Sequence, residues 1–213
     1  MKNQYIIAID GGTQSTKVGI FDTVGTEVCS HTIKLREIEL GENGRAEHPE
    51  DDLWDSLKLA CHEMFKKFHG DKKDIIGVGL GSIRCCRALI KENGDLMSPV
   101  QSWMDLRLSR PYEHDDDNVK YVTTTTGYLT YRLTGETKDT RSNYVGPWPI
   151  DPMTLDWFED KEKFDKDLKL SGVALTKAGK ELLDIIPITN SENYKNELIK
   201  FLETKHLDLA EIK

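Results

Sequence analysis

The sequence predicts an α/β fold in which three antiparallel strands begin a mixed sheet flanked by helices. Two short β-rich runs, 5–10 and 17–22, stand on either side of a glycine-containing turn. A third alternating run at 27–35 is followed by one long amphipathic segment at 48–68. A buried run at 74–82 then has strand character again. The resulting order, βββαβ, is typical of a layered α/β domain.

The first three runs are expected to be neighbours in the sheet. Small and hydroxyl-bearing residues separate the first two runs and suit a tight hairpin turn. The third run follows a second turn at Gly25, which is too short for a crossover. Two such short connections favour antiparallel pairing throughout.

Segment 48–68 is the clearest helix. Pro49 suits a first helical turn, acidic residues crowd the start, and lysines lie near the end. Its apolar residues recur at a spacing that forms one stripe. They are Leu53, Leu57, Ala60, Cys61 and Met64.

The second half of the chain has a weaker pattern. Segment 84–103 predicts two strands around a turn at Asn93–Gly94. The acidic segment 112–120 reads as a solvated loop, since its three aspartates lack the glycine and distal glutamate of a calcium loop. Segment 127–135 predicts a short helix closed by its terminal glycine.

The last third is expected to hold irregular and helical pieces. Three prolines exclude regular structure from 146–157, and glycines divide the helical pattern of 160–187. The tail at 194–213 reads as a charged amphipathic helix that lies on the surface or faces a partner.

Composition excludes some classes of function. The chain has 213 residues and a net charge of −8, which argues against a nucleic-acid partner. It shows no charged-then-apolar leader and no long apolar run, so we expect no membrane partner and a cytoplasmic location. Its four cysteines lack metal-ligand spacing and read as reduced structural thiols.

The turn after the first run has the chemistry of a phosphate site. A phosphate chain needs bare backbone donors and hydroxyl groups close by. Asp10 suits a magnesium ion that accompanies a nucleoside triphosphate, and Lys17 suits its terminal phosphate. An ordinary polar hairpin turn is the alternative. The predicted nucleotide-binding residues are Asp10, Gly11, Gly12, Thr13, Gln14, Ser15 and Lys17, with Asp10 as the metal ligand.

Four stretches together resemble one family. Segment 8–22 resembles the first phosphate motif of the actin-like ATPase superfamily, and in particular that of the FGGY carbohydrate kinases. Segments 44–54, 94–107 and 127–146 resemble later motifs of that family, in the family's order. Segment 94–107 contains a W-x-D-x-R motif, which in those enzymes lies beside the bound sugar.

This resemblance implies a ribonuclease H-like (actin-like ATPase) domain over 1–187, with 188–213 left as an unassigned tail. Between about 108 and 127 the chain has fewer residues than the family normally uses, which suggests an internal deletion. The implied reaction transfers a phosphoryl group from ATP, with Mg²⁺, to a hydroxyl of a sugar or polyol.

The resemblance also implies sugar contacts. Arg84 matches an arginine that contacts the polyol in glycerol kinases, and Trp103 and Asp105 would give an apolar wall and a hydroxyl acceptor. Cys85 stands where those enzymes carry glutamate, which argues against a glycerol-like contact set, and the Gln-Met-His pattern of xylulose-type kinases is absent as well. The Trp-x-Asp arrangement alone favours a pentulose-like substrate. Without the family match, Trp103 would read as core and Asp105 as the surface partner of Arg107.

The catalytic base is not identified. The family places it in a second domain, in a Gly-Asp motif that these 213 residues do not contain, so we expect little activity from the chain alone. An apolar face left by the missing domain could make a homodimer. The alternatives are a catalytically dead remnant that senses sugar or binds a partner, and a hydrolysing ATPase, which would not call for W-x-D-x-R.

Overall fold

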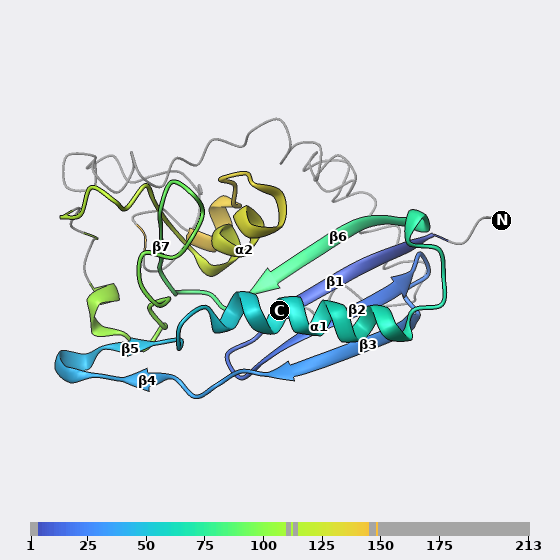
Figure 1. The fold of residues 1–213 in the computed structure, drawn as a ribbon, viewed down its shortest axis with the longest axis horizontal. Coiled ribbons are helices and arrows are strands. Elements are labelled where there is room, and N and C mark those ends of the chain that lie inside the picture. Colours follow the sequence, from blue (N-terminus) through green and yellow to red (C-terminus); the bar gives the residue numbers. More distant parts are fainter. Residues whose placement is uncertain (1–3, 110–111, 113–114, 145–147, 149–213) are drawn as a thin grey trace, which may run out of the picture. The chain divides into compact units, whose positions relative to one another are not determined.

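A computed structural model describes residues 4–109, 112, 115–144 and 148. Their largest element is a four-stranded sheet with the strand order β3-β2-β1-β6 (Figure 1). The strands are β1 (Tyr5–Gly11), β2 (Ser15–Asp22), β3 (Glu27–Lys34) and β6 (Ile75–Ser82). The first three pair antiparallel and β6 joins β1 in parallel. The predicted α/β fold with a mixed sheet is therefore confirmed.

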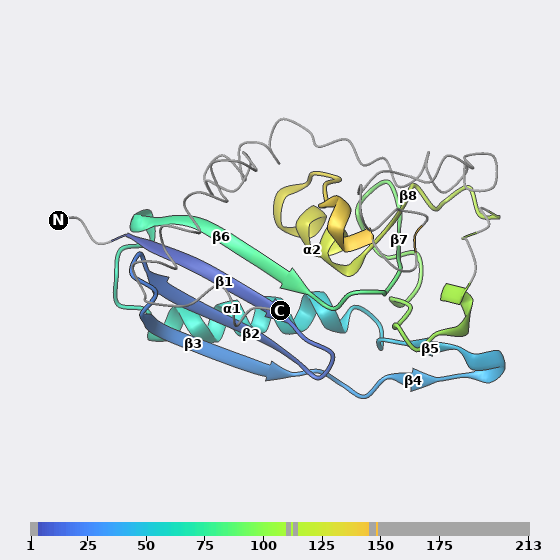
Figure 2. The same cartoon turned by 180° about the vertical axis from the view of Figure 1, so that it is seen from behind.

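Helix α1 (Asp52–Lys67) packs on β2 and β3, and Figure 2 shows it from the opposite side. The predicted apolar stripe is buried, with Leu57, Ala60 and Met64 at most 1% exposed. The helix begins later than predicted. Pro49 precedes it because the chain turns at Glu50, where φ is +48°, and Asp51 occupies the N-cap position.

The two faces of the sheet differ because side chains alternate along each strand. Ile9 on β1 and Val18 on β2 are buried on the α1 side, and Thr16 hydrogen-bonds Ser56 of α1 at 2.8 Å. Asp10 and Lys17 therefore lie on the face away from α1.

Beyond β6 the prediction of two strands over 84–103 is only partly correct. Strand β7 is restricted to Ala88–Ile90, and the returning segment makes only single bridges at Leu96 and Gln101. Pro99 in that segment has no N–H to donate, which interrupts the ladder. The strand partner of β7 is instead β8 (Tyr121–Thr123), which was not predicted.

The predicted helix near 127–135 is confirmed as α2 (Thr125–Thr134). The Thr124 side chain caps its N-terminus by accepting a hydrogen bond from the Gly127 amide. Gly135 ends it with φ of +73°, a left-handed conformation that glycine adopts at low cost.

Several short elements complete the described chain. They are β4 (Glu39–Leu40), β5 (Ala46–Glu47), and the 3₁₀ turns η1 (Glu42–Gly44), η2 (Lys72–Asp74), η3 (Leu106–Ser109) and η4 (Arg141–Tyr144). Strands β4 and β5 pair antiparallel as a hairpin.

The predictions for 160–187 and 194–213, and most of the prediction for 146–157, lie outside the described residues. In the part of the chain that is described, none of the helices has the length and apolar character needed to span a membrane.

Candidate functional site

The predicted phosphate turn connects β1 to β2. Gly11 pairs with Thr16, and the Gly12 amide donates to the Ser15 carbonyl at 2.9 Å, so the turn is tight. A Cβ on Gly12 would lie 3.2 Å from the same carbonyl oxygen, which explains the glycine. Thr13 and Gln14 form the exposed tip.

A buried hydroxyl lies beside this turn. Ser82, the last residue of β6, pairs with Gly11, and its Oγ has no hydrogen-bond partner among the described residues. A Cβ on Gly11 would lie 3.0 Å from that Oγ. The turn thus combines close backbone approach with an unsatisfied polar atom, and both suit a polar ligand.

Asp10 and Lys17 are cross-strand neighbours at the start of the turn. Both are exposed. The Lys17 ammonium donates to Glu27 of β3 at 3.0 Å, and Glu27 pairs with Phe21, four residues further along β2. The lysine is therefore directed away from the turn, while the Asp10 carboxylate stays beside it.

The loop that carries Arg84 begins at the same edge of the sheet. Ile83 donates its amide hydrogen to the Gly11 carbonyl at 2.8 Å, so Arg84 follows directly on the phosphate turn. Arg84 is exposed. Cys85 next to it has φ of +61°, an unfavourable conformation for a residue with a side chain. Thr125 holds the loop by donating its hydroxyl to the Ile83 carbonyl.

The W-x-D-x-R loop is fixed by its own polar residues. The Asp105 carboxylate accepts a hydrogen bond from the Ala46 amide at 2.9 Å, and it bonds the Arg107 guanidinium at 2.6 Å. Arg107 also reaches Glu47 at 2.6 Å. Trp103, by contrast, is 52% exposed. In this arrangement Asp105 anchors the loop to β5 and Trp103 faces solvent.

The electrostatics of Asp105 agree with that role. Burial favours its neutral form, but hydrogen bonds from Arg107 and from the Ala46 amide outweigh burial and lower its pKa to about 2. The same carboxylate raises the pKa of Arg107 above its ordinary value. This pair stays charged at neutral pH.

A second polar cluster joins the two helices and was not predicted. Tyr128 of α2 donates its hydroxyl to Asp51 at 2.6 Å, and Arg132 reaches the same carboxylate at 2.9 Å. Desolvation raises the pKa of Asp51, while Tyr128 and Arg132 oppose the rise. The participants lie 77 and 81 residues apart, so no local sequence signal could reveal them.

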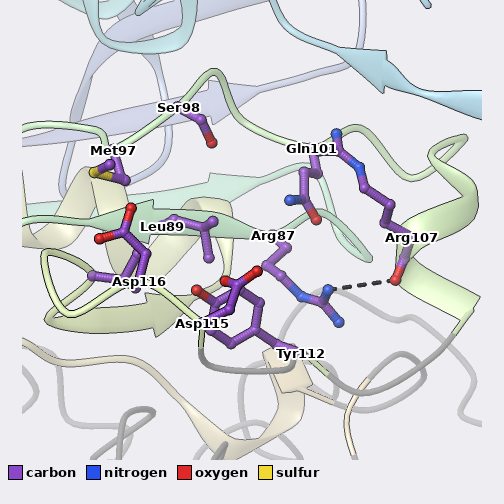
Figure 3. A pocket seen from close by; sticks show the side chains of 10 residues that line it. Arg87, Leu89, Met97, Ser98, Gln101, Arg107, Tyr112, Asp115 and Asp116 are labelled. Atoms are coloured by element: carbon purple, nitrogen blue, oxygen red, sulfur yellow. Dashed lines mark hydrogen bonds between the residues drawn. The ribbon is translucent and has the colours of Figure 1, made fainter. Parts of the chain in front are cut away.

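A cavity of about 450 Å³ lies beside the W-x-D-x-R loop (Figure 3). Its wall includes Arg87 and Leu89 of the β7 segment, and Gln101 from the returning segment. Tyr112 and Asp115 of the acidic segment also line it. None of the residues predicted to bind nucleotide or sugar lines this cavity.

The sequence matches known proteins over much of its length. The model for the FGGY family of carbohydrate kinases, N-terminal domain, matches residues 5–131. An uncharacterized sugar kinase of Escherichia coli strain K12, YgcE, is 51% identical over 166 residues, which are 78% of this chain and 34% of that protein. A glycerol kinase of Alcanivorax borkumensis is 26% identical over 128 residues, 59% of this chain and 26% of that protein. The chain thus spans about a third or less of these relatives.

The fold has solved counterparts as well. The crystal structure of a gluconate kinase from Lactobacillus acidophilus superposes with a TM-score of 0.64 at 16% sequence identity. The superposition covers 81% of this chain and 40% of the other. At that identity the likeness establishes the fold, which is the actin-like ATPase fold expected from the sequence.

Proposed function

The chain belongs to the FGGY family of carbohydrate kinases, and from this premise we propose that it supplies the phosphate-binding and sugar-binding side of an ATP-dependent sugar or polyol kinase. The observation that carries the proposal is the hydrogen bond from Ile83 to Gly11. It joins the phosphate turn and the Arg84 loop at one edge of the sheet. A phosphate donor and a hydroxyl acceptor bound to these two loops would be adjacent, as phosphoryl transfer requires.

The turn fits the phosphates of Mg²⁺-bound ATP, which supplies the γ-phosphoryl group when bound. The Gly11–Gly12 backbone allows close approach, and the Thr13, Gln14 and Ser15 side chains can donate hydrogen bonds. Asp10 would hold the metal through an oxygen. Because no three acidic, histidine or cysteine side chains converge among the described residues, most metal ligands would come from phosphate and water.

Lys17 would contribute positive charge to the same turn. To contact a phosphate its ammonium would have to leave Glu27, with which it forms an exposed ion pair. Such pairs contribute about 0.2–1 kcal/mol, so the cost is small relative to a charge-assisted bond to phosphate.

On the sugar side, Arg84 and Trp103 would contact the acceptor. Asp105 would support that contact indirectly, because it holds the loop that carries Trp103. The exposed indole offers an apolar wall and the guanidinium offers donors to hydroxyl groups. To accept a hydrogen bond from a sugar hydroxyl directly, the Asp105 carboxylate would have to give up a bond from the Ala46 amide or from Arg107. A pentulose-like acceptor remains the preferred class.

The described residues provide binding groups for both reactants, and we assign no catalytic base among them. We therefore propose that these 213 residues alone transfer phosphate from ATP only slowly. We also propose that the protein is located in the cytoplasm. General-base assistance is typically worth about 10²–10⁴-fold in rate. The alternative function is a sugar sensor or partner-binding protein, which would bind sugar without needing the phosphate turn.

Calorimetric titration of the 213-residue chain with Mg²⁺-ATP tests the proposal. Asp10→Asn should abolish measurable binding, because it removes the carboxylate beside the turn. Asp55→Asn, which changes another exposed acid, on α1, is the control and should leave binding unchanged. Sugar binding without nucleotide binding would contradict the kinase assignment and support the sensor. Nucleotide binding that Asp10→Asn does not weaken would contradict the role of the turn.

A further inference from the structure

The loop that carries Arg84 has a strained backbone. Cys85 has φ of +61°, and a residue with a side chain keeps such a conformation only where surrounding contacts enforce it. Within the loop, the Arg84 carbonyl accepts a weak hydrogen bond from the Cys86 thiol at 3.6 Å. The strain at Cys85 therefore has to be balanced by contacts with neighbouring elements.

Helix α2 supplies one of these contacts. Four consecutive threonines, 123–126, lead into the helix, and Figures 1 and 2 both show α2 beside the end of β6. The Thr124 hydroxyl caps α2, whereas the Thr125 hydroxyl donates to the Ile83 carbonyl, 42 residues earlier. Thr125 is 0% exposed, so water does not compete for this bond. Because the Ile83 amide donates to Gly11, Ile83 is held on both sides of its backbone.

The same face of α2 is fixed on the start of α1. Tyr128 and Arg132 both donate to the carboxylate of Asp51, the N-cap residue of α1. Arg132 also donates to the Tyr128 hydroxyl at 2.8 Å, and its guanidinium lies 4.7 Å from the centre of the Trp54 ring. Tyr128 is 0% exposed. These contacts restrict both rotation and sliding of α2.

Helical spacing joins the two attachments. Thr125 and Tyr128 are three residues apart, so their side chains lie on one face of α2. A rotation of the helix that released Tyr128 from Asp51 would also displace the Thr125 hydroxyl from Ile83. The position of the loop is thus tied to a contact made at the start of α1.

We propose that Thr125 and Tyr128 are positioning residues: α2, attached to Asp51, holds the Ile83 carbonyl and so keeps Arg84 beside the phosphate turn. The importance of Arg84 rests on the proposed function, but the link between α2 and the loop does not. Neither residue contacts a reactant in this scheme, because both act through the backbone of the loop. Such support reduces the ordering that a ligand would otherwise have to impose.

Alkylation of Cys86 by iodoacetamide tests the link in the full 213-residue chain. Cys86 is 0% exposed and burial raises its pKa to about 12, so it reacts when the loop opens. Thr125→Val leaves a buried carbonyl unsatisfied and should raise the rate of alkylation about tenfold. Thr125→Ser keeps the hydroxyl and should restore the wild-type rate. Fragmentation of the labelled peptides assigns each label, and Cys61 of α1 reports on the rest of the domain.

Tyr128→Phe tests the second attachment. It should raise the Cys86 rate about threefold, since Arg132 still bonds Asp51. Tyr131→Phe is the matched control, the same chemical change on the same helix, where the hydroxyl donates to the Glu92 carbonyl at 3.5 Å. It should leave the rate unchanged. In the double variant of Thr125→Val and Tyr128→Phe, the rate should equal that of Thr125→Val alone, because Tyr128 acts through Thr125.

Three results would overturn the inference. They are an unchanged Cys86 rate in Thr125→Val, an equal rise at Cys61, which would indicate general loosening, and independent, multiplying effects in the double variant. A selective rise at Cys86 that Thr125→Ser reverses supports it. None of these measurements uses nucleotide or sugar, so a failed Mg²⁺-ATP titration would contradict the proposed function and leave the link between α2 and the loop standing.

Discussion

The phosphate turn and the W-x-D-x-R loop use polar residues in opposite ways. In the turn, Asp10 and the tip residues Thr13 and Gln14 are exposed. In the loop, Asp105 is buried and bonded to protein, and the exposed residues are the apolar Trp103, Met104 and Leu106. A polar residue in a motif can thus serve either as a ligand contact or as the anchor that presents another side chain. Burial of the carboxylate distinguishes the two roles.

The largest expected effect concerns the anchor. Asp105→Ala leaves the Ala46 amide and the Arg107 guanidinium without their carboxylate, so the free energy of unfolding should fall by about 3 kcal/mol. Trp103→Ala removes a half-exposed side chain and should cost less than about 1 kcal/mol. Urea unfolding of both variants measures the difference. If both variants lost the same free energy of unfolding, Asp105 would contribute no more to stability than Trp103, and the contrast between anchor and exposed residue would be wrong.

Acid titration sharpens the same contrast. The pKa of Asp105 is about 2 in the folded chain against an ordinary value of 3.8, so the unfolded chain takes up the proton first as the pH falls. Its contribution to stability is complete above pH 3.8 and is lost towards pH 2, with a total of about 2 kcal/mol. Asp105→Asn should remove this part of the acid dependence of unfolding, whereas Trp103→Ala should retain it. If the free energy of unfolding of Asp105→Asn fell with pH as steeply as that of the wild type, Asp105 would not be the source of this acid dependence.

The smallest stability effect belongs to the turn. Lys17→Met breaks only an exposed ion pair with Glu27, so the free energy of unfolding should change by less than about 1 kcal/mol. Mg²⁺-ATP affinity should nevertheless fall about tenfold, since a charge-assisted hydrogen bond to phosphate is lost.

Glu27→Gln provides the reciprocal test. It releases Lys17 from its partner and should leave nucleotide affinity equal or higher in calorimetric titration. A loss of affinity in Glu27→Gln would show that the ion pair itself, rather than a freed lysine, supports the turn.

Much of the fold could be predicted because its signals are local. The strand alternation of β1–β3, the stripe of α1 and the glycine that ends α2 are each visible within one short segment. The missed elements depend on distant partners. Strand β8 has three residues and exists through pairing with β7, about 30 positions earlier, and β4 and β5 have two residues each.

The candidate site divides in the same way. The composition of the turn at 10–17 indicates phosphate chemistry without any tertiary information. The hydrogen bond that holds the buried Asp105 carboxylate comes from the amide of Ala46, which lies 59 residues away. Sequence patterns give the type of a polar residue, but its available lone pairs are decided by tertiary contacts.

The parallel pairing of β1 with β6 also determines where the chain can tolerate an insertion or a deletion. One residue inserted within β6 would reverse which side of the sheet each later side chain of that strand faces, and it would shift Ser82 out of its pairing with Gly11. One residue inserted after Ser109 would leave the pairing of Gly11 with Ser82 intact. Insertions and deletions should therefore be tolerated in the acidic segment and rejected between the start of β6 and Arg84, a difference that a scan of single-residue insertions would reveal as two sharply bounded zones.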